Sequence, residues 1–580
     1  MILNKYQQQA TEATENNVLV IGSPGSGKTR VIVERVAYLI ENSKTSPYEL
    51  ALFTFTRLAA KEMKTRIEER IGIQAQGITV GTFHSVGLSL IQRFGELIGL
   101  RPGKITVYSE FESSYLLKDI AKELGIYKKS WKPRKKDILK TFSDYYEKGI
   151  DPEKNDPTYG IFKTFGSRLR ENNSLSYDSI LTGLKLLLPN IYKYLQFKHI
   201  ICDEAHDNSK TQWDILKIFQ ELLGTSLYVI ADTDQAIYGW RNADVDYLIR
   251  HQSEFKTYHL KVNYRSTGHI VDAANNLIKN NFIRVEKTME ANREPGEKPE
   301  RILHVTSKEV VELYQKVKGG PNTAILGRNH YLLGKTSQIM DDQGIPNTYV
   351  GKEGKLTNSE EFRRFHAFLK LSVNPFDNFA FLLIKDALEL MTGEMGYAEI
   401  RLMAAKEGKS HFQVWHKSFT ATPFEQAESH GHNSLNDVSD AIDNFFKSEQ
   451  KDWKSETRDF VYQWILDNPT GSIAEYLDWL AVYDIQDEIK EKPKGVQIQT
   501  IHSAKGLEFD TVILAGMNEG ILPSNRTDSI EDQESERRLC YVAVTRAKNK
   551  LIITSRPEMS EFHGKIINEP VSRFIKEMGL

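Results

Sequence analysis

Apolar residues recur along this chain in short runs that end in glycine or polar segments. The first run, residues 18–21, leads into the glycine-rich segment 22–29, after which residues 31–36 repeat apolar positions at helical spacing. Further short runs of mostly apolar residues occupy 51–55, 78–80, 199–202 and 227–231. Short apolar runs that alternate with helical patterns indicate an α/β fold built on a parallel sheet.

The pattern changes after residue 85. From 86 to about 195 the chain shows amphipathic helical periodicity without new strand-like runs. We therefore expect a first parallel-sheet domain formed by residues 1–85 and 196–262, interrupted by a helical insertion at 86–195. The insertion contains a basic cluster at 128–136 around Trp131, which is typical either of a solvated face or of contacts with nucleic-acid phosphates.

The composition narrows the class of protein. A chain of 580 residues suggests three or four domains of about 150 residues each, and no apolar stretch approaches the roughly 20 residues that span a bilayer. The net charge is −2, so any nucleic-acid surface has to be a local groove. Two cysteines without ligand partners and an N-terminus unlike a signal peptide predict a cytoplasmic protein with no disulfide framework and no membrane contact.

Residues 22–29 carry the spacing G-x-x-x-x-G-K-T between a predicted strand and a predicted helix. In that setting the glycines let backbone N–H groups surround phosphates, and the helix N-terminus adds its positive dipole end. Lys28 is expected to reach the β- and γ-phosphates, and Thr29 to ligate Mg²⁺. A chance glycine turn is the alternative. The other expected nucleotide contacts in and beside this segment are Ser23, Gly25, Ser26, Gly27 and Arg30.

An apolar run that ends in two acids predicts the second half of a hydrolysis site. Asp203 and Glu204 follow the run 199–202. An aspartate there holds Mg²⁺ through water, and a glutamate orients and polarises the attacking water. Paired acids also serve as helix N-caps, which is the alternative. Gln235 follows the run 227–231 and is placed to sense a γ-phosphate, unless it is a surface glutamine.

Aromatic and amide side chains near the predicted strand ends suggest contacts with bases. Gln7, one short helix ahead of the first strand, can pair with an adenine edge, or it is a solvated surface glutamine. Phe55 and His84 end two runs on the same expected sheet edge, which favours a track for single-stranded nucleic acid. A core position is the alternative for Phe55. Trp240 offers a further stacking ring, or it is a buried core residue.

The order of these motifs resembles that of superfamily-one DNA helicases of the Rep/UvrD/PcrA type. Besides Gln7, Asp203, Glu204 and the glycine-rich segment, the matching segments are 54–56, 81–84, 234–241, 263–267, 501–509 and 537–547. The resemblance implies two RecA-like parallel-sheet motor domains, each interrupted by a mainly helical inserted subdomain. The second motor domain then comprises residues 263–354 and 496–580, and residues 355–495 form a helical accessory insertion that is mobile in the family.

The resemblance also implies roles for residues at the matching positions. Tyr264 stacks on adenine, and Glu508 contacts the ribose. Arg265 reaches the γ-phosphate and Arg546 acts as a second arginine finger, so these two join Lys28, Glu204 and Gln235 in the catalytic set. Because both arginines belong to the second domain, hydrolysis depends on closure of the cleft between the domains. The resemblance assigns the single-strand path to Phe55, Thr56, Thr82, His84, Trp240 and Arg241, with His502 coupling that path to the ATP site.

Several features depart from the family pattern. The Arg-Gly-Ile-Gly element expected after residues 374–375 is missing, and the chain instead continues with residues 387–396. His206 stands where the family usually has Gln, which we interpret as a local substitution in the coupling between ATP site and DNA path. The chain ends at Leu580, so the tail of larger members is not expected. The histidines of the accessory insertion lack the spacing of a metal site: His411, His416, His430 and His432.

Together these observations predict an ATP- and Mg²⁺-dependent motor that moves 3′ to 5′ on single-stranded DNA and unwinds duplex, with single-stranded DNA and single-strand/duplex junctions as partners. Roles in DNA repair or replication follow from the resemblance, and a protein partner is left open. The alternative is a DNA-stimulated ATPase motor or switch subunit of a repair or defence complex that does not unwind alone. A small-molecule phosphoryl transferase would leave Phe55 and Trp240 unexplained.

Overall fold

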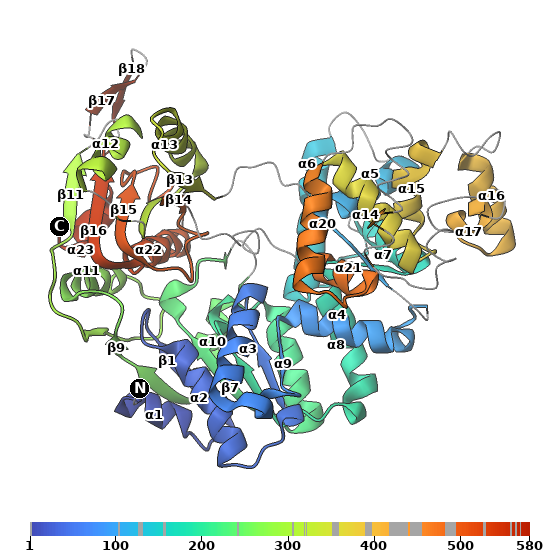
Figure 1. The fold of residues 1–580 in the computed structure, drawn as a ribbon, viewed down its shortest axis with the longest axis horizontal. Helices are drawn as coiled ribbons and strands as arrows, with labels where there is room; N and C mark the ends of the chain where they lie inside the picture. The colour runs from blue at the N-terminus through green and yellow to red at the C-terminus, as the bar shows by residue number, and fades with distance from the viewer. Residues whose placement is uncertain are drawn as a thin grey trace. The chain divides into compact units, whose positions relative to one another are not determined.

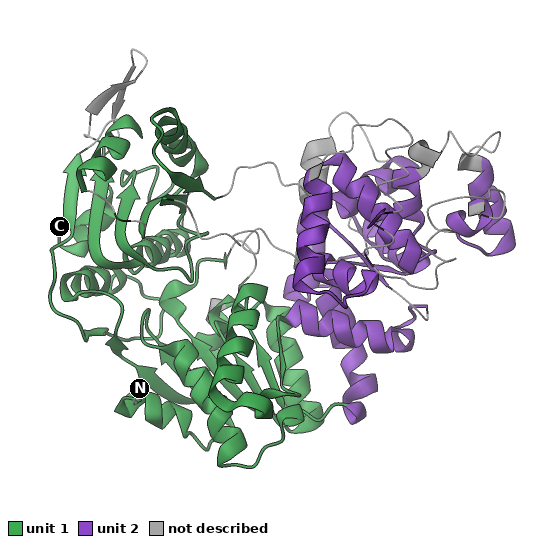
Figure 2. Cartoon of the chain, viewed as in Figure 1, with its two compact units in different colours: residues 1–82, 195–352, 484–580 green, residues 83–194, 353–483 purple. Residues whose placement is uncertain are grey.

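A computed structural model of the chain divides into two compact units (Figure 2). The first unit contains residues 1–82, 195–352 and 484–580, and the second contains residues 83–194 and 353–483. The residues that the structure describes are 3–101, 105–125, 131–154, 158–239, 243–303, 307–317, 320, 322–350, 359–388, 397–416, 435, 439–440, 455–481, 495–525, 529–556, 559–562, 565–568 and 570–580.

The first unit contains a six-stranded sheet with the strand order β3-β2-β6-β7-β1-β8, in which all neighbouring strands are parallel. Figure 1 labels its strands β1 and β7. The strands are β1 (Asn17–Gly22), β2 (Leu50–Phe53), β3 (Thr79–Gly81), β6 (His199–Cys202), β7 (Ser226–Ala231) and β8 (Lys256–Leu260). Because they are parallel, their carboxyl ends lie along one edge, where Ile21 pairs with Ala231 and Phe53 with Cys202. This edge is where residues that follow the strands come together.

Helices cover this sheet and share a core with its strands. They are α1 (Lys5–Thr11), α2 (Lys28–Glu41), α3 (Arg57–Ile71), α9 (Lys210–Leu223) and α10 (Val245–Arg250), with short 3-10 turns η1 (Pro47–Glu49), η2 (Gly72–Ala75), η5 (Ala205–Asp207), η6 (Thr233–Gln235) and η8 (Gln252–Glu254). Val18 and Val20 of β1 pack in one cluster with Val31 and Val36 of α2. The apolar runs of the sequence are therefore strands that are buried by helices, as expected for a parallel sheet.

The same unit contains a second parallel sheet of six strands, with the order β11-β16-β15-β12-β14-β13. Its strands are β11 (Glu300–Leu303), β12 (Thr323–Gly327), β13 (Asn347–Tyr349), β14 (Val496–Thr500), β15 (Phe509–Ala515) and β16 (Ala547–Ser555). Leu326 and Leu514 belong to one core cluster and Ile325 and Ile513 to another, because alternate strand residues face opposite sides of the sheet.

Helices lie on both faces of the second sheet. The first of these clusters includes residues of α11 (Gly268–Ile278), α22 (Ile530–Val544) and α23 (Arg573–Met578), and the second includes residues of α12 (Ser307–Val317) and α13 (His330–Asp342). Two small strand pairs complete this part: β9 (Val262–Asn263) with β10 (Glu290–Ala291), and β17 (Met559–Phe562) with β18 (Lys565–Asn568). The predicted α/β class, with two RecA-like parallel-sheet domains and mainly helical insertions, is confirmed.

The second unit is mainly helical. Its helices are α4 (Phe83–Phe94), α5 (Glu110–Glu123), α6 (Trp131–Lys148), α7 (Tyr159–Glu171), α8 (Ser179–Ile191), α14 (Glu360–Val373), α15 (Asn378–Leu388), α16 (Tyr397–Glu407), α17 (His411–His416), α20 (Ser455–Asp467) and α21 (Ile473–Ala481), with 3-10 turns η3 (Gly95–Ile98) and η4 (Tyr192–Tyr194). The expectation of no strands in 86–195 is wrong, since β4 (Thr106–Tyr108) pairs in parallel with β5 (Ser174–Ser176). Three-residue strands are too short to show an alternating pattern.

Residues from both predicted insertions share a buried polar core in this second unit. Asp377 is fully buried and accepts hydrogen bonds from Thr106 Oγ1 and Tyr108 OH, each at 2.7 Å. Lys370 forms a buried ion pair with Glu112, with its Nζ 2.6 and 2.7 Å from the two carboxylate oxygens. Lys370 and Glu112 are 258 residues apart in the chain. The two stretches that interrupt the sheets therefore pack against each other. Among the described helices, none has the length and apolar character needed to cross a membrane.

Candidate active site

The glycine-rich segment forms an open loop between β1 and α2. Gly25 and Gly27 have positive φ values of 66° and 81°, which residues with a Cβ atom rarely adopt. A Cβ atom on Gly25 would lie 2.5 Å from Cβ of Arg265, and one on Gly27 would lie 2.8 Å from Nε2 of Gln7. Ser26 Oγ donates to the carbonyl of Ser23 at 2.7 Å, which closes the turn. The loop therefore brings backbone N–H groups to the N-terminus of α2, the arrangement that binds phosphates.

Lys28, the first residue of α2, lies beside the acids that follow β6. Its Nζ is 3.2 Å from Oε1 of Glu204. Burial favours an uncharged lysine, but Glu204, Asp232 and Asp203 outweigh it, so the pKa of Lys28 is raised. Burial alone would raise the pKa of Glu204, but the positive charges of Lys28 and Lys505 outweigh burial. The pKa of Glu204 is therefore lowered, and its carboxylate stays ionised.

Asp203 and Glu204 have different surroundings although they are neighbours. Asp203 Oδ1 accepts the N–H of Glu204 at 2.9 Å, and burial together with the charge of Glu204 raises the pKa of Asp203 to about 7. Glu204 has φ of 49° and precedes the 3-10 turn η5, but its side chain makes no capping hydrogen bond. The geometry of Glu204 therefore does not support the alternative that it is a helix cap. Such an aspartate, beside a phosphate loop with a threonine after its lysine, fits a Mg²⁺ site completed by water and phosphate oxygens.

Gln235, which follows β7 of the first sheet, contacts Arg546, which precedes β16 of the second sheet. Gln235 follows β7 and is 4% exposed, so it is not a surface glutamine. Its Nε2 donates to Asp232 Oδ2 at 2.6 Å, and its Oε1 accepts from Nη2 of Arg546 at 3.0 Å. Arg546 precedes β16, and burial together with Arg265 lowers the pKa of Arg546 to about 9. Gln235 therefore touches a residue from each half of the unit.

Residues 263–265 contact the glycine-rich loop. They begin the second half of the first unit, which is the part that contains the second sheet. Asn263 Nδ2 donates to the carbonyl of Pro24 at 2.8 Å, and the N–H of Tyr264 donates to the carbonyl of Gly25 at 2.9 Å. The guanidinium of Arg265 donates from Nε to Oε2 of Glu508 at 2.8 Å. The structure thus brings together three of the residues that the resemblance placed around the nucleotide.

Gln7 and Tyr264 are connected to each other and to the loop by hydrogen bonds. Gln7 is 3% exposed, so it is not a solvated surface glutamine. Its Nε2 donates to the carbonyl of Ser26 at 3.0 Å, and its Oε1 accepts the N–H of Asn4 at 3.1 Å. Asn4 Nδ2 also donates to the hydroxyl of Tyr264 at 2.6 Å, and Tyr264 is 40% exposed. An amide and an accessible ring therefore stand together beside the loop, as adenine recognition requires.

The residues predicted for the DNA path are spread over both units. Phe55 stacks on Tyr238, with ring centroids 5.0 Å apart, and is partly buried against the core. Tyr238 OH donates to the carbonyl of His502 at 3.4 Å. Thr56 Oγ1 accepts the N–H of Ala59 at 3.2 Å and so caps α3. Thr82 is buried just after β3, and His84 stacks on Tyr177 in the second unit, with ring centroids 4.0 Å apart. Trp240 and Arg241 lie outside the described residues. Arg30, which was predicted as a nucleotide contact and not as part of the DNA path, lies in the first turn of α2.

The site also contains charged residues to which sequence reasoning assigned no role, among them Lys505, Asp207 and Asp232. Lys505 Nζ forms an ion pair with Asp207 and donates to the carbonyl of Gln235 at 2.9 Å. Asp232 accepts the side-chain amide of Gln235. Lys505 lies inside the matching segment 501–509 and Asp232 two residues before the segment 234–241, but no spacing rule assigned them a role.

His206 occupies a central position among these groups. Its Nδ1 accepts the N–H of Asp232 at 3.0 Å, and its Nε2 lies 3.3 Å from Oε2 of Glu204 and 3.2 Å from Nζ of Lys505. Burial, Lys505 and Lys28 lower the pKa of His206 well below its usual range. The neutral ring therefore carries its proton on Nε2 and donates toward Glu204.

Comparison with known proteins agrees with this geometry. Residues 3–256 match the UvrD/REP helicase N-terminal domain, and residues 258–408 and 433–558 match the UvrD-like helicase C-terminal domain. The chain is 29% identical over 635 residues to an "ATP-dependent DNA helicase PcrA" of Staphylococcus epidermidis, covering 99% of this chain and 86% of the relative. A protein of the same name from Staphylococcus aureus is 28% identical over 636 residues, with the same coverage.

Proposed function

Because this chain belongs to the UvrD/REP family of superfamily-one DNA helicases, we propose that it is a motor that moves 3′ to 5′ on single-stranded DNA and unwinds the duplex ahead of it. This family consists of ATP-dependent DNA helicases, which implies that the chain hydrolyses ATP. The direction of movement, unwinding without a partner and the roles of single residues are part of the proposal.

The observation that carries the proposal is the meeting of both sheets at the glycine-rich loop. Lys28 begins α2 and Glu204 follows β6 of the first sheet, whereas Arg265 and Arg546 come from segments beside the second sheet. We call the two parts of the first unit, each built on one of the six-stranded sheets, its two lobes. Because cations from both lobes surround one phosphate loop, hydrolysis is sensitive to how the lobes close. This sensitivity is what a motor needs, because each hydrolysis event then opens and closes the lobes.

In the proposed mechanism, ATP binds with its phosphates in the loop and its adenine between Gln7 and Tyr264. The triphosphate competes for Lys28, which is paired with Glu204 in the structure. Glu204 is then free to orient a water for in-line attack on the γ-phosphorus and to accept its proton. Thr29 and Asp203 would hold Mg²⁺, which would neutralise part of the negative charge of the triphosphate.

The charge that develops on the transferred phosphoryl group is stabilised from the second lobe. Arg265 and Arg546 supply two guanidinium groups, and Gln235 holds Arg546 through its amide oxygen. Loss of the γ-phosphate removes the anion that these cations share, so the lobes separate. Tyr238 contacts both Phe55 and the backbone of His502, which connects this separation to the proposed DNA path.

Strand displacement tests the proposal. The purified full chain is incubated with ATP, Mg²⁺ and duplexes that carry either a 3′ or a 5′ single-stranded tail, with Glu204→Gln as the control for hydrolysis. We expect the wild type to release a strand only from the 3′-tailed duplex and Glu204→Gln to release none. Displacement from the 5′-tailed duplex alone would overturn the proposed direction.

A second candidate is a DNA-stimulated ATPase subunit that needs a partner to unwind. The family match leaves out residues 409–432, and the sequence lacks the family's Arg-Gly-Ile-Gly element after residues 374–375. Both differences fall in the accessory insertion at 355–495. Stimulation of ATP hydrolysis by DNA without displacement of either tailed duplex would favour this second candidate.

A further inference from the structure

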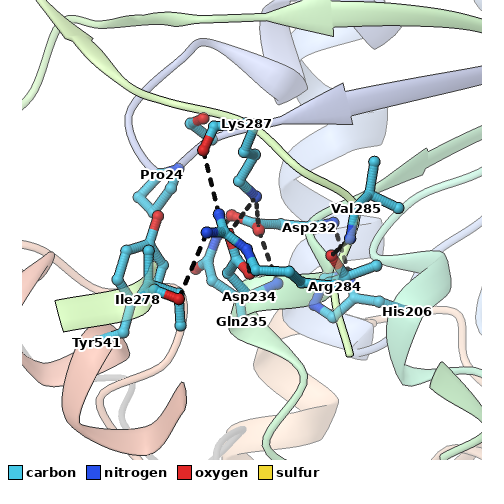
Figure 3. Close-up of polar contacts among 12 residues, drawn as sticks. Pro24, His206, Asp232, Asp234, Gln235, Ile278, Arg284, Val285, Lys287 and Tyr541 are labelled. Carbon is cyan, nitrogen blue, oxygen red and sulfur yellow. Dashed lines mark hydrogen bonds and ion pairs between the residues drawn. The ribbon is translucent and has the colours of Figure 1, made fainter. Parts of the chain in front are cut away.

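Two cationic side chains after α11 reach the acids that follow β7. Figure 3 shows Lys287 and Arg284 directed toward Asp232 and Asp234. Arg284 donates to both carboxylate oxygens of Asp234, from Nε at 3.0 Å and from Nη2 at 2.7 Å. Lys287 Nζ pairs with Asp232 and lies 3.3 Å from Asp234. The carboxylates are fully buried, and the side chain of Lys287 is 3% exposed.

The segment that carries these cations belongs to the second half of the unit. Residues 279–289 connect α11 with β10, and the N–H of Val285 donates to Oγ1 of Thr233 at 3.1 Å. Nη2 of Arg284 also donates to the carbonyl of Lys287 at 3.1 Å, so the segment supports its own shape. The second half thus docks on the end of β7 through backbone and side-chain bonds together.

Asp232 is bonded to two residues that lie beside the proposed site of hydrolysis. Its Oδ2 accepts from Gln235 Nε2 at 2.6 Å, and its N–H donates to Nδ1 of His206 at 3.0 Å. Its other oxygen, Oδ1, accepts from Lys287 and from the N–H of Asp234. One carboxylate therefore connects the buried lysine to Gln235, and the backbone of the same residue sets the ring of His206.

The ionisation of Asp232 depends on nearby positive charge. Burial raises the pKa of Asp232, but Lys287 and, after it, Lys28 outweigh burial, so the pKa lies below its ordinary value. A fully buried carboxylate that loses its cation takes up a proton or changes its position, because an uncompensated charge is costly in an interior of low dielectric constant. Either change removes the acceptor that fixes Gln235.

We propose that Lys287 is a positioning residue for ATP hydrolysis, which acts through Asp232 to hold Gln235 and His206 in place. The inference rests on the proposed function, because it assigns a role in hydrolysis. Gln235 in turn holds Arg546, and the ring of His206 faces Glu204, so a misplaced Asp232 disturbs both sides of the reacting phosphate. Lys287 touches neither the loop nor the nucleotide in this scheme.

Lys287→Met tests the inference, because it keeps the length of the side chain and removes its charge. We expect kcat for DNA-stimulated ATP hydrolysis to fall about 10- to 100-fold, the usual effect of a small misplacement of catalytic groups, with KM for ATP changed less than about twofold. The matched control is Arg284→Met. It removes an equal charge from the same segment, but the guanidinium of Arg284 binds Asp234 instead of the carboxylate that holds Gln235.

Stability and a double variant separate positioning from a purely structural role. The urea midpoint of both variants is measured, and Lys287→Met is also made in an Asp232→Asn background, where it should change kcat by less than about twofold because its partner is already uncharged. Equal losses of kcat in Lys287→Met and Arg284→Met, or an undiminished effect in the Asp232→Asn background, overturn the inference. A wild type without ATP hydrolysis overturns the proposed function and this inference with it, whereas an active wild type with an unaffected Lys287→Met overturns the inference alone.

Discussion

Lys28 is the residue on which the proposed ATP site depends most directly. It begins α2, and its Nζ lies 3.2 Å from Glu204 Oε1. Because the surrounding acids raise its pKa, the ammonium group stays charged at neutral pH and is able to neutralise phosphate oxygens. The same charge keeps Glu204 ionised. Lys28 therefore serves both the binding of phosphate and the ionisation of Glu204, the proposed base.

Replacement of Lys28 by alanine is expected to abolish ATP hydrolysis and to leave most of the affinity for single-stranded DNA. The hydrolysis rate is measured at saturating ATP, and DNA affinity by fluorescence anisotropy without nucleotide. Lys64→Ala, at an exposed position of α3, is the control and should behave like the wild type. Hydrolysis near the wild-type rate in Lys28→Ala would mean that the site is assigned wrongly.

His366 makes the stability of the second unit depend on pH. Its ring lies between the carbonyl of Phe362 and the hydroxyl of Tyr476, each 2.6 Å from a ring nitrogen, and burial lowers its pKa to about 3. The unfolded chain has the ordinary value of about 6.5. Between these values the unfolded state binds a proton that the folded state does not, so stability falls as pH decreases.

For this residue alone, the free energy of unfolding is expected to drop by about 1.4 kcal/mol between pH 7.5 and 5.5. Urea unfolding of the second unit, followed by tryptophan fluorescence, measures the drop in the wild type and in His366→Gln. In His366→Gln, the drop in the free energy of unfolding between pH 7.5 and 5.5 should be smaller than in the wild type by about 1.4 kcal/mol. An equal drop in both proteins would show that His366 does not titrate on unfolding.

The residues of the ATP site were predictable to different degrees. Lys28 and Glu204 lie in contiguous segments, where a local pattern states the chemistry. The contacts of Lys287 and Lys505 were not predictable, because a lone lysine far away in sequence has no pattern that names its partner. Trp240 lies outside the described residues, so its proposed stacking on DNA stays a prediction.

At the scale of elements, the central strands of the first sheet followed from apolar runs because parallel strands are buried on both faces. The run 199–202 is strand β6, and the run 227–231 lies within β7. The second sheet followed from the family resemblance. Strand β8, which the sequence did not predict, lies at an edge of its sheet. The other strands that were not predicted have only two to four residues each: β4, β5, β9, β10, β13, β17 and β18. Segments this short have too few inward positions to differ from ordinary loop sequence.

The contact between the two helical stretches also escaped prediction. Lys370 on α14 and Glu112 on α5 form a buried pair, and each residue looks like an ordinary surface charge in sequence. Loss of one partner leaves the other charge buried without compensation. The pair therefore makes the packing of these helices sensitive to single substitutions.

Lys370→Met is expected to destabilise the second unit by about 3 to 5 kcal/mol, and addition of Glu112→Gln should restore part of that loss. Urea unfolding of the full chain provides the measurement. Arg66→Met is the control, since Arg66 and Glu62 form an exposed pair on α3 that contributes at most about 1 kcal/mol. A cost for Lys370→Met no larger than that of the control would contradict the role of the buried pair.

At the scale of the whole molecule, a net charge of −2 leaves DNA binding to local surfaces, while the ATP site collects residues from position 7 to position 546. The two six-stranded sheets contribute to it unequally. The first supplies the phosphate loop and the acids, and segments beside the second supply Arg265, Arg546 and Lys287. We therefore expect the rate of ATP hydrolysis to change with any ligand that alters the contact between the two sheet-containing halves of the first unit.

The rate of ATP hydrolysis by the purified full chain, with and without a single-stranded oligonucleotide, tests this account most directly. We expect DNA to raise kcat about tenfold or more, within the usual range of coupling between two sites, and to do so at a concentration where it saturates binding. Lys28→Ala should show no rate in either condition. A wild-type rate that is the same with and without DNA would contradict the coupling of ATP hydrolysis to a DNA path.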